Sequence, residues 1–261
     1  MHRFFIPEDW IRSNTVTVTG PQAHQIARVL RMQPGDRIVV LDNSGWEIET
    51  RLVEVRPDAV QGEVVRRSLA TTEPRTKIAV YQGILRSKNF ELVLQKGTEL
   101  GVVEFVPVIA DRCVVSDLEA VEKKRQRWEW IIQEAAEQCR RGRKPVLRPA
   151  VLLPPACERA RHGAGLSMIF WEGDSNQPQK SEDRTTMRSL LRTPPPSSKK
   201  NWPPLTISLF FGPEGGFAPE EISLAERYGL LPATLGPRIL RAETAALVAV
   251  SAILYELGDL E

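Results

Sequence analysis

The chain has 261 residues, of which 42% are hydrophobic and 26% charged, so it is no wholly disordered protein and has room for two ordinary domains or one large one. The formal net charge is only +2, so no global charge demands a polyanionic partner and any nucleic-acid signal must be local. The first ten residues lack an apolar signal-peptide core, and the longest apolar stretch, "AALVAVSAILY", is too short to span a bilayer. We therefore expect a cytoplasmic protein without membrane contact.

The first 72 residues have the pattern of short strands with one early helix. "TVTVTG" alternates between polar and apolar residues, and "PQAHQIARVLRMQPGD" reads as a helix that begins at Pro21 and ends before Pro34. The strand-like segments "RIVVLDNSG", "WEIETRLVEV" and "AVQGEVV" follow, with turn residues between them. This pattern predicts a small β-barrel domain over residues 1–72.

From Thr76 onward, strand-like and helical segments alternate, which predicts an α/β domain with a parallel sheet over residues 76–261. Helices are expected over "SKNFELVLQKGTELG" and over residues 118–141, 219–228 and 240–257. Gly97 lies inside the first of these helices, where a better helix former would be worth about 1 kcal/mol. The expected strands are "KIAVYQGIL", "VEFVPVI", "LSMIFW", "LTISLFF" and "LLPATLG".

Residues 174–204 interrupt this alternation with a change in composition. Six of the 20 prolines fall there, among Ser, Lys and Asp, and so little apolar content cannot build a core element. We expect an exposed, flexible insertion without a catalytic part. The three cysteines lack C-x-x-C spacing, which predicts neither a disulfide framework nor a metal site: Cys113, Cys139 and Cys157.

Two unusual turns follow expected strands. The first is "FFGPEGGF" at 210–217, and the second is "LGPRILRAETAA" from Leu235. Glu214 would repel a phosphate, and no Lys or Ser/Thr stands in the P-loop position, so a phosphate cradle is the weaker interpretation. The glycines either turn the chain or let an uncharged or cationic ligand approach the backbone, and Glu214 could instead cap local N–H groups.

Basic residues gather locally, in "RRGRKPVLR" at 140–148, in "KKRQR" at 123–127, and at Arg66, Arg67 and Arg75. Taken alone, such runs are usually solvated helix ends. On the helix expected over residues 118–141, the apolar residues predict one buried face. The opposite face carries Arg127, Glu134, Gln138 and Arg141. The last helix is apolar on nearly every side and rich in alanine, so it is either an interior helix or a subunit interface.

In combination, these segments resemble the ribosomal RNA small subunit methyltransferase E family of the SPOUT methyltransferases. The resemblance rests on the two turns in this order, on "QKGTELGV" and "RWEWIIQEAAEQCRR", and on "HRFF" with "HQIARVLRMQPGD…DNSG". It implies a PUA-like barrel over residues 1–72, followed by a SPOUT-type parallel sheet whose C-terminal part is tied in a trefoil knot. It further implies a homodimer through the C-terminal helix.

The resemblance implies that S-adenosylmethionine (AdoMet) binds in the knot and that N3 of a uridine in 16S (small-subunit) ribosomal RNA is methylated. The implied cofactor-binding residues are Glu172, Gly173, Gly212, Pro213, Glu214, Gly215, Gly216, Leu235, Gly236, Ile239, Leu240 and Arg241. Removing the N3 proton creates an anion, so cations held beside the uracil ring would stabilise the negative charge that develops during the reaction. Arg241 and Arg238 are candidates to stabilise that charge, although Arg241 could simply pair with a carboxylate. Glu243 or Glu99 could accept the proton.

The partner implied is small-subunit ribosomal RNA or the assembled small subunit. Phosphate binding needs cations held on one surface, and the candidate RNA-binding residues are Lys88, Lys96, Arg127, Glu134, Gln138, Arg140, Arg141 and Arg143. Two alternatives stay open. One is a SPOUT ribose 2′-O-methyltransferase, and the other is a non-catalytic RNA-binding or ribosome-assembly protein.

Overall fold

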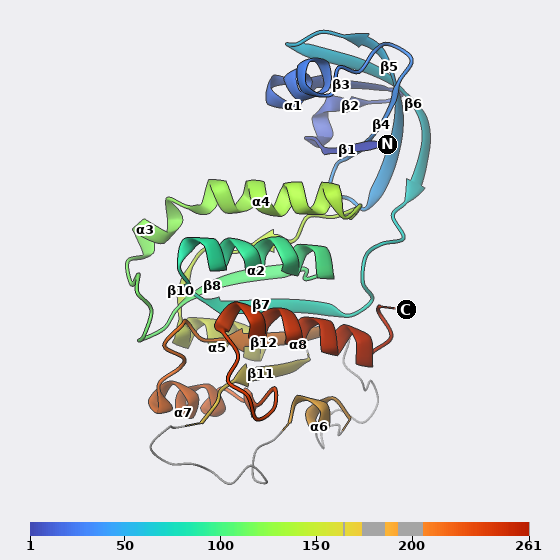
Figure 1. Cartoon of the computed structure of the whole chain (residues 1–261). Coiled ribbons are helices and arrows are strands. Elements are labelled where there is room, and N and C mark those ends of the chain that lie inside the picture. The colour runs from blue at the N-terminus through green and yellow to red at the C-terminus, as the bar shows by residue number, and fades with distance from the viewer. Residues whose placement is uncertain (164, 174–185, 193–205, 261) are drawn as a thin grey trace. The chain divides into compact units, whose positions relative to one another are not determined.

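The computed structural model describes residues 1–163, 165–173, 186–192 and 206–260 (Figure 1). The chain divides into two compact units. The first contains Met1–Glu73 and Gln133–Lys144, and the second contains Pro74–Ile132 and Pro145–Glu261. A segment from the middle of the sequence therefore belongs with the N-terminal unit, and two consecutive stretches of sequence do not describe this division.

The first unit is built on a six-stranded sheet with one parallel and four antiparallel pairings. Its core consists of alternate strand residues such as Val16, Val18, Ile38 and Val40, together with Ile26. The strand order across the sheet is β1 (His2–Phe5), β4 (Arg37–Leu41), β5 (Trp46–Val55), β6 (Ala59–Leu69), β3 (Thr15–Thr19) and β2 (Ile11–Arg12). A short 3-10 helix, η1 (Glu8–Trp10), precedes β2.

The early helix is shorter than its sequence pattern predicts. It consists of α1 (Gly20–His24) followed directly by a π-helical turn, η2 (Gln25–Val29). The N–H of Leu30 donates to the carbonyl of Gln25 at 2.9 Å, which closes the wider i to i+5 turn. Arg31 then adopts a left-handed φ of 52°, so the helix cannot continue to Gln33 as expected.

The second unit contains the predicted parallel sheet. Every pairing in it is parallel. The order is β10 (Val151–Leu152), β8 (Glu104–Ile109), β7 (Lys77–Gly83), β12 (Thr206–Phe211), β11 (Leu166–Phe170) and β13 (Leu231–Ala233), with β9 (Val146–Leu147) beside β8. Because neighbouring strands are parallel, crossover connections must carry the chain back between them. The order of the strands in the sheet also differs from their order in the chain.

Helices cover both faces of this sheet, because both faces are apolar. Ile78 and Val80 of β7 pack on one side with α2 (Ser87–Leu100) and α8 (Ala242–Glu256), while Tyr81 packs on the other with α5 (Leu153–His162) and α7 (Pro219–Arg227). Figure 1 shows α2 and α8 side by side over the sheet, in agreement with their direct packing. A sheet buried on both sides is the usual setting for parallel strands.

Gly97 has a packing reason. A Cβ atom at this position of α2 would lie 2.8 Å from the Phe105 ring of β8. Phe105 is itself 1% exposed and cannot move outward without opening the core. The expectation of a better helix former is therefore wrong here, since the helix needs Gly97 to approach the sheet.

Three further elements differ from the expectations. The helix expected over 118–141 is two helices, α3 (Leu118–Glu122) and α4 (Arg125–Gln138). The sequence analysis did not predict α5, whose two prolines stand in its first turn, where no N–H donor is needed. Part of the expected insertion is also ordered, since α6 (Met187–Arg192) buries Met187 and Leu191 in the main core. Residues 174–185 and 193–204 of the expected insertion lie outside the described residues.

No helix in the described ranges is long and apolar enough to cross a membrane.

Candidate functional site

Three loops leave the parallel sheet at one level. Phe170, the last residue of β11, lies opposite both Phe211 at the end of β12 and Ala233 at the end of β13. The loops that follow contain Glu172 and Gly173, then Gly212 to Gly216, then 234–241. The carboxyl ends of neighbouring parallel strands therefore place the starts of the three loops with the predicted cofactor-binding residues at one edge, where open α/β sheets bind ligands.

The second loop is a tight turn. The N–H of Gly216 donates to the carbonyl of Pro213 at 2.8 Å, and Gly216 has a φ of 68°, which favours glycine. The turn also packs closely on β7, because a Cβ at Gly83 would lie 2.6 Å from the Pro213 nitrogen. The glycines of the loop and of the neighbouring strand end thus allow a close backbone approach.

Side chains fasten this second loop to other segments. The carboxylate of Glu214 accepts the Arg86 backbone N–H at 2.9 Å, just before α2 begins. Arg112 donates to the Gly215 carbonyl at 2.9 Å, and Gln82 donates to the Gly212 carbonyl at 3.2 Å. Glu214 Oε1 therefore caps an N–H group of a distant segment, and not the local N–H groups that the alternative interpretation named.

Glu221 holds the end of the same loop. Its side chain is buried at 6% exposure in the first turn of α7. One oxygen accepts the Ala218 N–H at 2.8 Å and the other accepts the Asp111 N–H at 3.0 Å. A single carboxylate therefore caps α7 and ties it to the segment after β8, which is a role that the sequence analysis missed. A Glu three residues after the cap position was the signal for it.

The third loop exposes its charged side chains. Gly236 has a φ of 113°, and a Cβ there would meet no atom within 4 Å, so space is open beside this backbone. Arg238 and Arg241 are exposed, and Ile239 is 80% exposed. Neither guanidinium makes a hydrogen bond or ion pair with any described residue. The structure therefore does not show the carboxylate pairing that was the alternative for Arg241.

Glu243 lies in the first turn of α8, directly after the third loop. It is 8% exposed, and within the described ranges it makes no hydrogen bond and no ion pair. A carboxylate is favoured at a helix N-terminus by the helix dipole, but that position leaves its lone pairs open to a ligand. Glu243 and Arg241 thus place an acceptor and donors at the same end of α8.

Glu99 is not near these loops within the chain. Helix α2 begins after the carboxyl end of β7 and ends before the amino end of β8, so it runs back along the sheet. Twelve residues separate Ser87 from Glu99, which is about 18 Å along a helix. Glu99 instead pairs with Lys96 at 2.8 Å, at the opposite edge of the sheet.

Three predicted RNA-binding residues lie on α2 and α4 of the second unit: Lys88, Lys96 and Arg127. Arg127 forms a bidentate pair with Glu91, with N–O distances of 2.6 and 2.8 Å. That hydrogen bond and the charge of Arg127 outweigh partial burial and lower the pKa of Glu91. Lys88 is exposed in the first turn of α2 and makes no hydrogen bond or ion pair with a described residue. Lys88 is therefore the one with an unengaged charge.

In the first unit, the basic run after α4 separates into buried and exposed members. Arg141 is 3% exposed and pairs with Glu73 at 2.8 Å. Burial alone would raise the pKa of Glu73, but the hydrogen bond and charge of Arg141 and the N–H groups of Gly142 and Arg143 lower it. The Arg143 side chain donates to the Ser44 carbonyl at 2.6 and 3.1 Å.

Arg140 differs from these neighbours. It is exposed, and its guanidinium makes no hydrogen bond or ion pair with the residues that the structure describes. Its backbone has a left-handed φ of 64°, where glycine is usual after a helix, and its carbonyl accepts from Thr72 at 2.8 Å.

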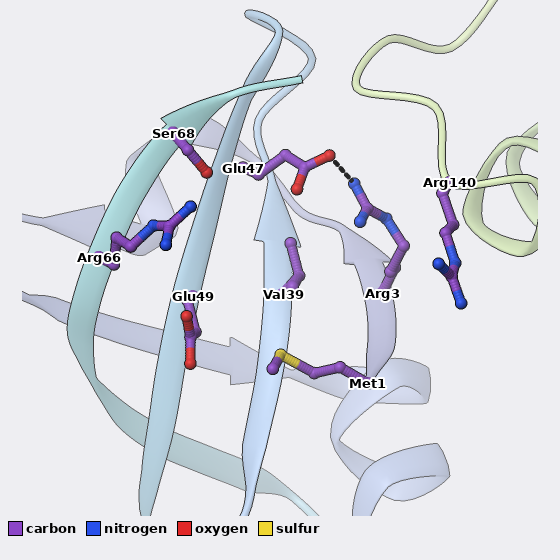
Figure 2. Close-up of a pocket in the computed structure, with 8 residues that line it drawn as sticks. All are labelled: Met1, Arg3, Val39, Glu47, Glu49, Arg66, Ser68 and Arg140. Carbon is purple, nitrogen blue, oxygen red and sulfur yellow. Dashed lines mark hydrogen bonds and ion pairs between the residues drawn. The ribbon is translucent and has the colours of Figure 1, made fainter. Parts of the chain in front are cut away.

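Arg140 borders two shallow hollows of the first unit, of about 280 and about 430 Å³. Figure 2 shows the first, with Arg3, Arg66 and Arg140 around Glu47, Glu49 and Ser68. The second hollow includes the predicted residues Glu134 and Gln138. Arg66 is one of the local basic residues noted in the sequence. Arg3 and Glu47 were not predicted as site residues, because they lie far apart in sequence, on β1 and β5, and no single motif contains both.

Across the described ranges, no three His, Cys, Asp or Glu side chains are grouped so that they could hold a metal ion.

Comparison with known proteins places both parts of the chain. Residues 72–254 match a family model described as an RNA methyltransferase domain, and residues 18–65 match one described as an RNA methyltransferase PUA domain. The PUA-like assignment of the N-terminal part is thereby confirmed.

Relatives of known name and structure cover nearly the whole chain. Ribosomal RNA small subunit methyltransferase E of Bacillus subtilis is 33% identical over 98% of this chain and 97% of its own. The Neisseria gonorrhoeae enzyme of that name, solved bound to S-adenosyl methionine, is 28% identical with a TM-score of 0.81 over 98% of each chain. The Legionella pneumophila protein Lpg2936, solved with the bound cofactor SAM, is 31% identical with a TM-score of 0.81 over 97% of each. The chain therefore belongs to the ribosomal RNA small subunit methyltransferase E family.

Proposed function

We propose that this chain binds AdoMet at the three loops and methylates N3 of a uridine in 16S ribosomal RNA, either free or in the assembled small subunit. The observation that carries the proposal is the common level of the loops, with Phe170 opposite both Phe211 and Ala233, in a chain of this family. The two relatives solved with this cofactor support it. Action on ribosomal RNA would place the protein in the cytoplasm.

The loops fit such a cofactor in shape and charge. At both Gly216 and Gly236, a Cβ would meet no atom within 4 Å, so a ligand can reach the backbone there. The Glu243 carboxylate adds negative potential without a partner among the described residues, which suits a cation better than a phosphate. When bound, AdoMet supplies an electrophilic methyl group on a sulfonium. We assign its binding to the residues of the three loops that the sequence analysis named.

The chain's own groups act on the uracil ring. N3 carries a proton, and when it leaves, negative charge spreads to the flanking carbonyl oxygens. Arg241 and Arg238 have guanidinium groups at the third loop that no described residue engages, and they would donate hydrogen bonds to those oxygens. Glu243 Oε would accept the N3 proton or hold it in a hydrogen bond. We give Glu99 no role in the same chain's site.

The proposal includes a trefoil knot of SPOUT type and a homodimer. The chain passes from β12 through α7 to β13, which lies on the far side of β11 in the sheet. It then returns, so that α8 packs on α2 and on the neighbouring strands β7 and β12. A path of this kind is compatible with the knot. Helix α8 also carries a stripe at i, i+4, i+7 and i+11 outside the core, which suits a second copy: Thr244, Val248, Ser251 and Tyr255.

Nucleoside analysis of ribosomal RNA tests the reaction. A strain without this gene should lack 3-methyluridine in small-subunit RNA, and the wild-type gene should restore it. Glu243→Gln should restore it at least about tenfold more slowly, because the amide cannot take a proton, while the exposed Glu220→Gln should match wild type.

The same analysis separates the alternatives. A 2′-O-methylated nucleoside in place of 3-methyluridine would support the ribose methyltransferase. RNA that is unchanged between the two strains, together with no AdoMet binding in calorimetry, would support the non-catalytic protein.

A further inference from the structure

We propose that the two hollows of the first unit form one track for consecutive nucleotides of single-stranded RNA, with Arg3 and Arg140 at its centre. This inference rests on the proposed function, since it names how the same RNA substrate is gripped away from the reacting base. All residues that line the hollows belong to the first unit.

The two hollows adjoin each other. Both are lined by Met1, Arg3 and Arg140, so they meet along these three residues. The first extends over the sheet surface to Glu49 and Arg66 on β5 and β6, and the second extends to Gln25, Glu134 and Gln138 beside η2 and α4. Volumes of about 280 and about 430 Å³ are small for an elongated ligand when taken singly, but together they suit a short extended strand.

The charges of the first hollow leave two cations over. Glu47 pairs with Arg3 at 2.6 Å, and Glu49 pairs with Arg37 at 2.8 Å. Arg66 and Arg140 have no ion pair with any described residue, so the net unpaired charge is positive. Figure 2 shows them from β6 and from the segment after α4, on either side of the Arg3–Glu47 pair. Two separated cations suit successive phosphates of a strand.

Arg3 provides the floor. Its side chain is 10% exposed, yet its buried Nε–H has no hydrogen-bond partner among the described residues. A buried donor without a partner is unfavourable, so this atom calls for an acceptor, such as a base or ribose oxygen. A nine-tenths buried cation with an unused donor distinguishes this place from an ordinary charged surface.

The remaining polar groups favour RNA over a simple anion. Acceptors at Glu47 and Glu49 and a hydroxyl at Ser68 lie beside the guanidinium donors, and Gln25, Glu134 and Gln138 line the second hollow. Nucleobase edges present donors and acceptors together, whereas an isolated phosphate would gain nothing from the carboxylates. An unpaired strand exposes those edges, and a duplex hides them.

Arg140 also has a backbone that favours another residue. Its left-handed φ is accessible to glycine but strained for arginine, and the Thr72 hydrogen bond to its carbonyl helps hold it there. The side chain so presented has no partner in the described part of the chain. A function for this side chain at the junction of the hollows accounts for its strained position.

The test uses the full chain and a fluorescein-labelled single-stranded RNA of about eight nucleotides, with a matched duplex as second probe. The double variant Arg66→Ala/Arg140→Ala should bind the single strand about tenfold or more weakly. The slope of log K against log salt should fall in magnitude by about 0.7 for each lost phosphate contact. The matched control is Arg12→Ala/Arg56→Ala, two exposed arginines outside both hollows, which should bind as wild type does.

A second variant tests the floor. Arg3→Lys keeps the charge but removes the Nε–H donor, and it should weaken single-strand binding by a few fold with no change in salt slope. Thermal unfolding of each variant monitors the fold. Wild-type affinity and slope in the folded double variant, or equal losses in the Arg12/Arg56 control, would overturn the proposal.

AdoMet calorimetry on the same proteins separates this inference from the proposed function. Normal AdoMet binding with unchanged RNA binding in the double variant rejects the track alone. Loss of RNA binding in that variant, with no AdoMet binding by wild type, rejects the methyltransferase proposal and leaves the track standing.

Discussion

The second and third loops differ in how they are held, although both follow neighbouring parallel strands. Side chains of Gln82 and Arg112 and the backbone of Arg86 bind the loop at 212–216, and Glu221 fixes its end. By contrast, residues 235–240 make no hydrogen bond to another described segment, and only Thr234 braces Gly236 locally. One loop is therefore pre-formed by its neighbours, while the polar groups of the other have no partner on another described segment.

The largest effect is expected in the loosely held loop. Arg241→Ala should lower kcat about 10²- to 10³-fold, because a donor to the developing negative charge is lost. The free energy of unfolding should change little, since Arg241 is exposed and its guanidinium has no partner among the described residues. Single-turnover methylation of RNA measures the rate, and the exposed Arg227→Ala serves as control. An unchanged kcat would remove Arg241 from the mechanism.

The next effect is expected in the pre-formed loop and concerns stability. Glu221→Gln keeps one acceptor oxygen but turns an amide group toward a second N–H, so one buried donor loses its partner. Unfolding in urea should show a loss of about 1–3 kcal/mol, with weaker AdoMet binding. The neighbouring exposed Glu220→Gln should leave both unchanged. If the two variants are equally stable, the loop does not depend on this carboxylate.

The smallest effect is expected at Arg112. Its hydrogen bond to the Gly215 carbonyl is exposed to solvent, so Arg112→Ala should cost less than about 1 kcal/mol. Calorimetry should find AdoMet affinity lowered by a few fold, because the turn is no longer held from this side. The exposed Arg161→Ala on α5 is the control. A loss of unfolding free energy larger than that of Glu221→Gln would mean that Arg112 holds the loop more strongly than Glu221 does.

The periodicity of apolar residues was enough to predict the parallel sheet and the places of the two glycine turns after its strands. Strands buried on both faces form continuous apolar runs, and the residues after them leave at one edge. Sequence position alone could not separate Arg140 from Arg141, because burial of one and exposure of the other depends on Glu73, 68 residues from Arg141. Gly97 is a similar case, since Phe105 comes from the next strand. In both cases a contact with another element, which no local sequence pattern encodes, determines the environment of the residue.

The assignment of residues 133–144 to the first unit has a consequence for dissecting this protein. The chain passes between the units three times, after Glu73, after Ile132 and after Lys144. A fragment that ended at residue 72 would lack Glu73 and the whole of residues 133–144. It would also lose the packing of Ala136 in one cluster with Phe5 and Leu41. The first unit is therefore not a detachable module, and grafting it onto another enzyme would require residues 133–144 to be supplied as well.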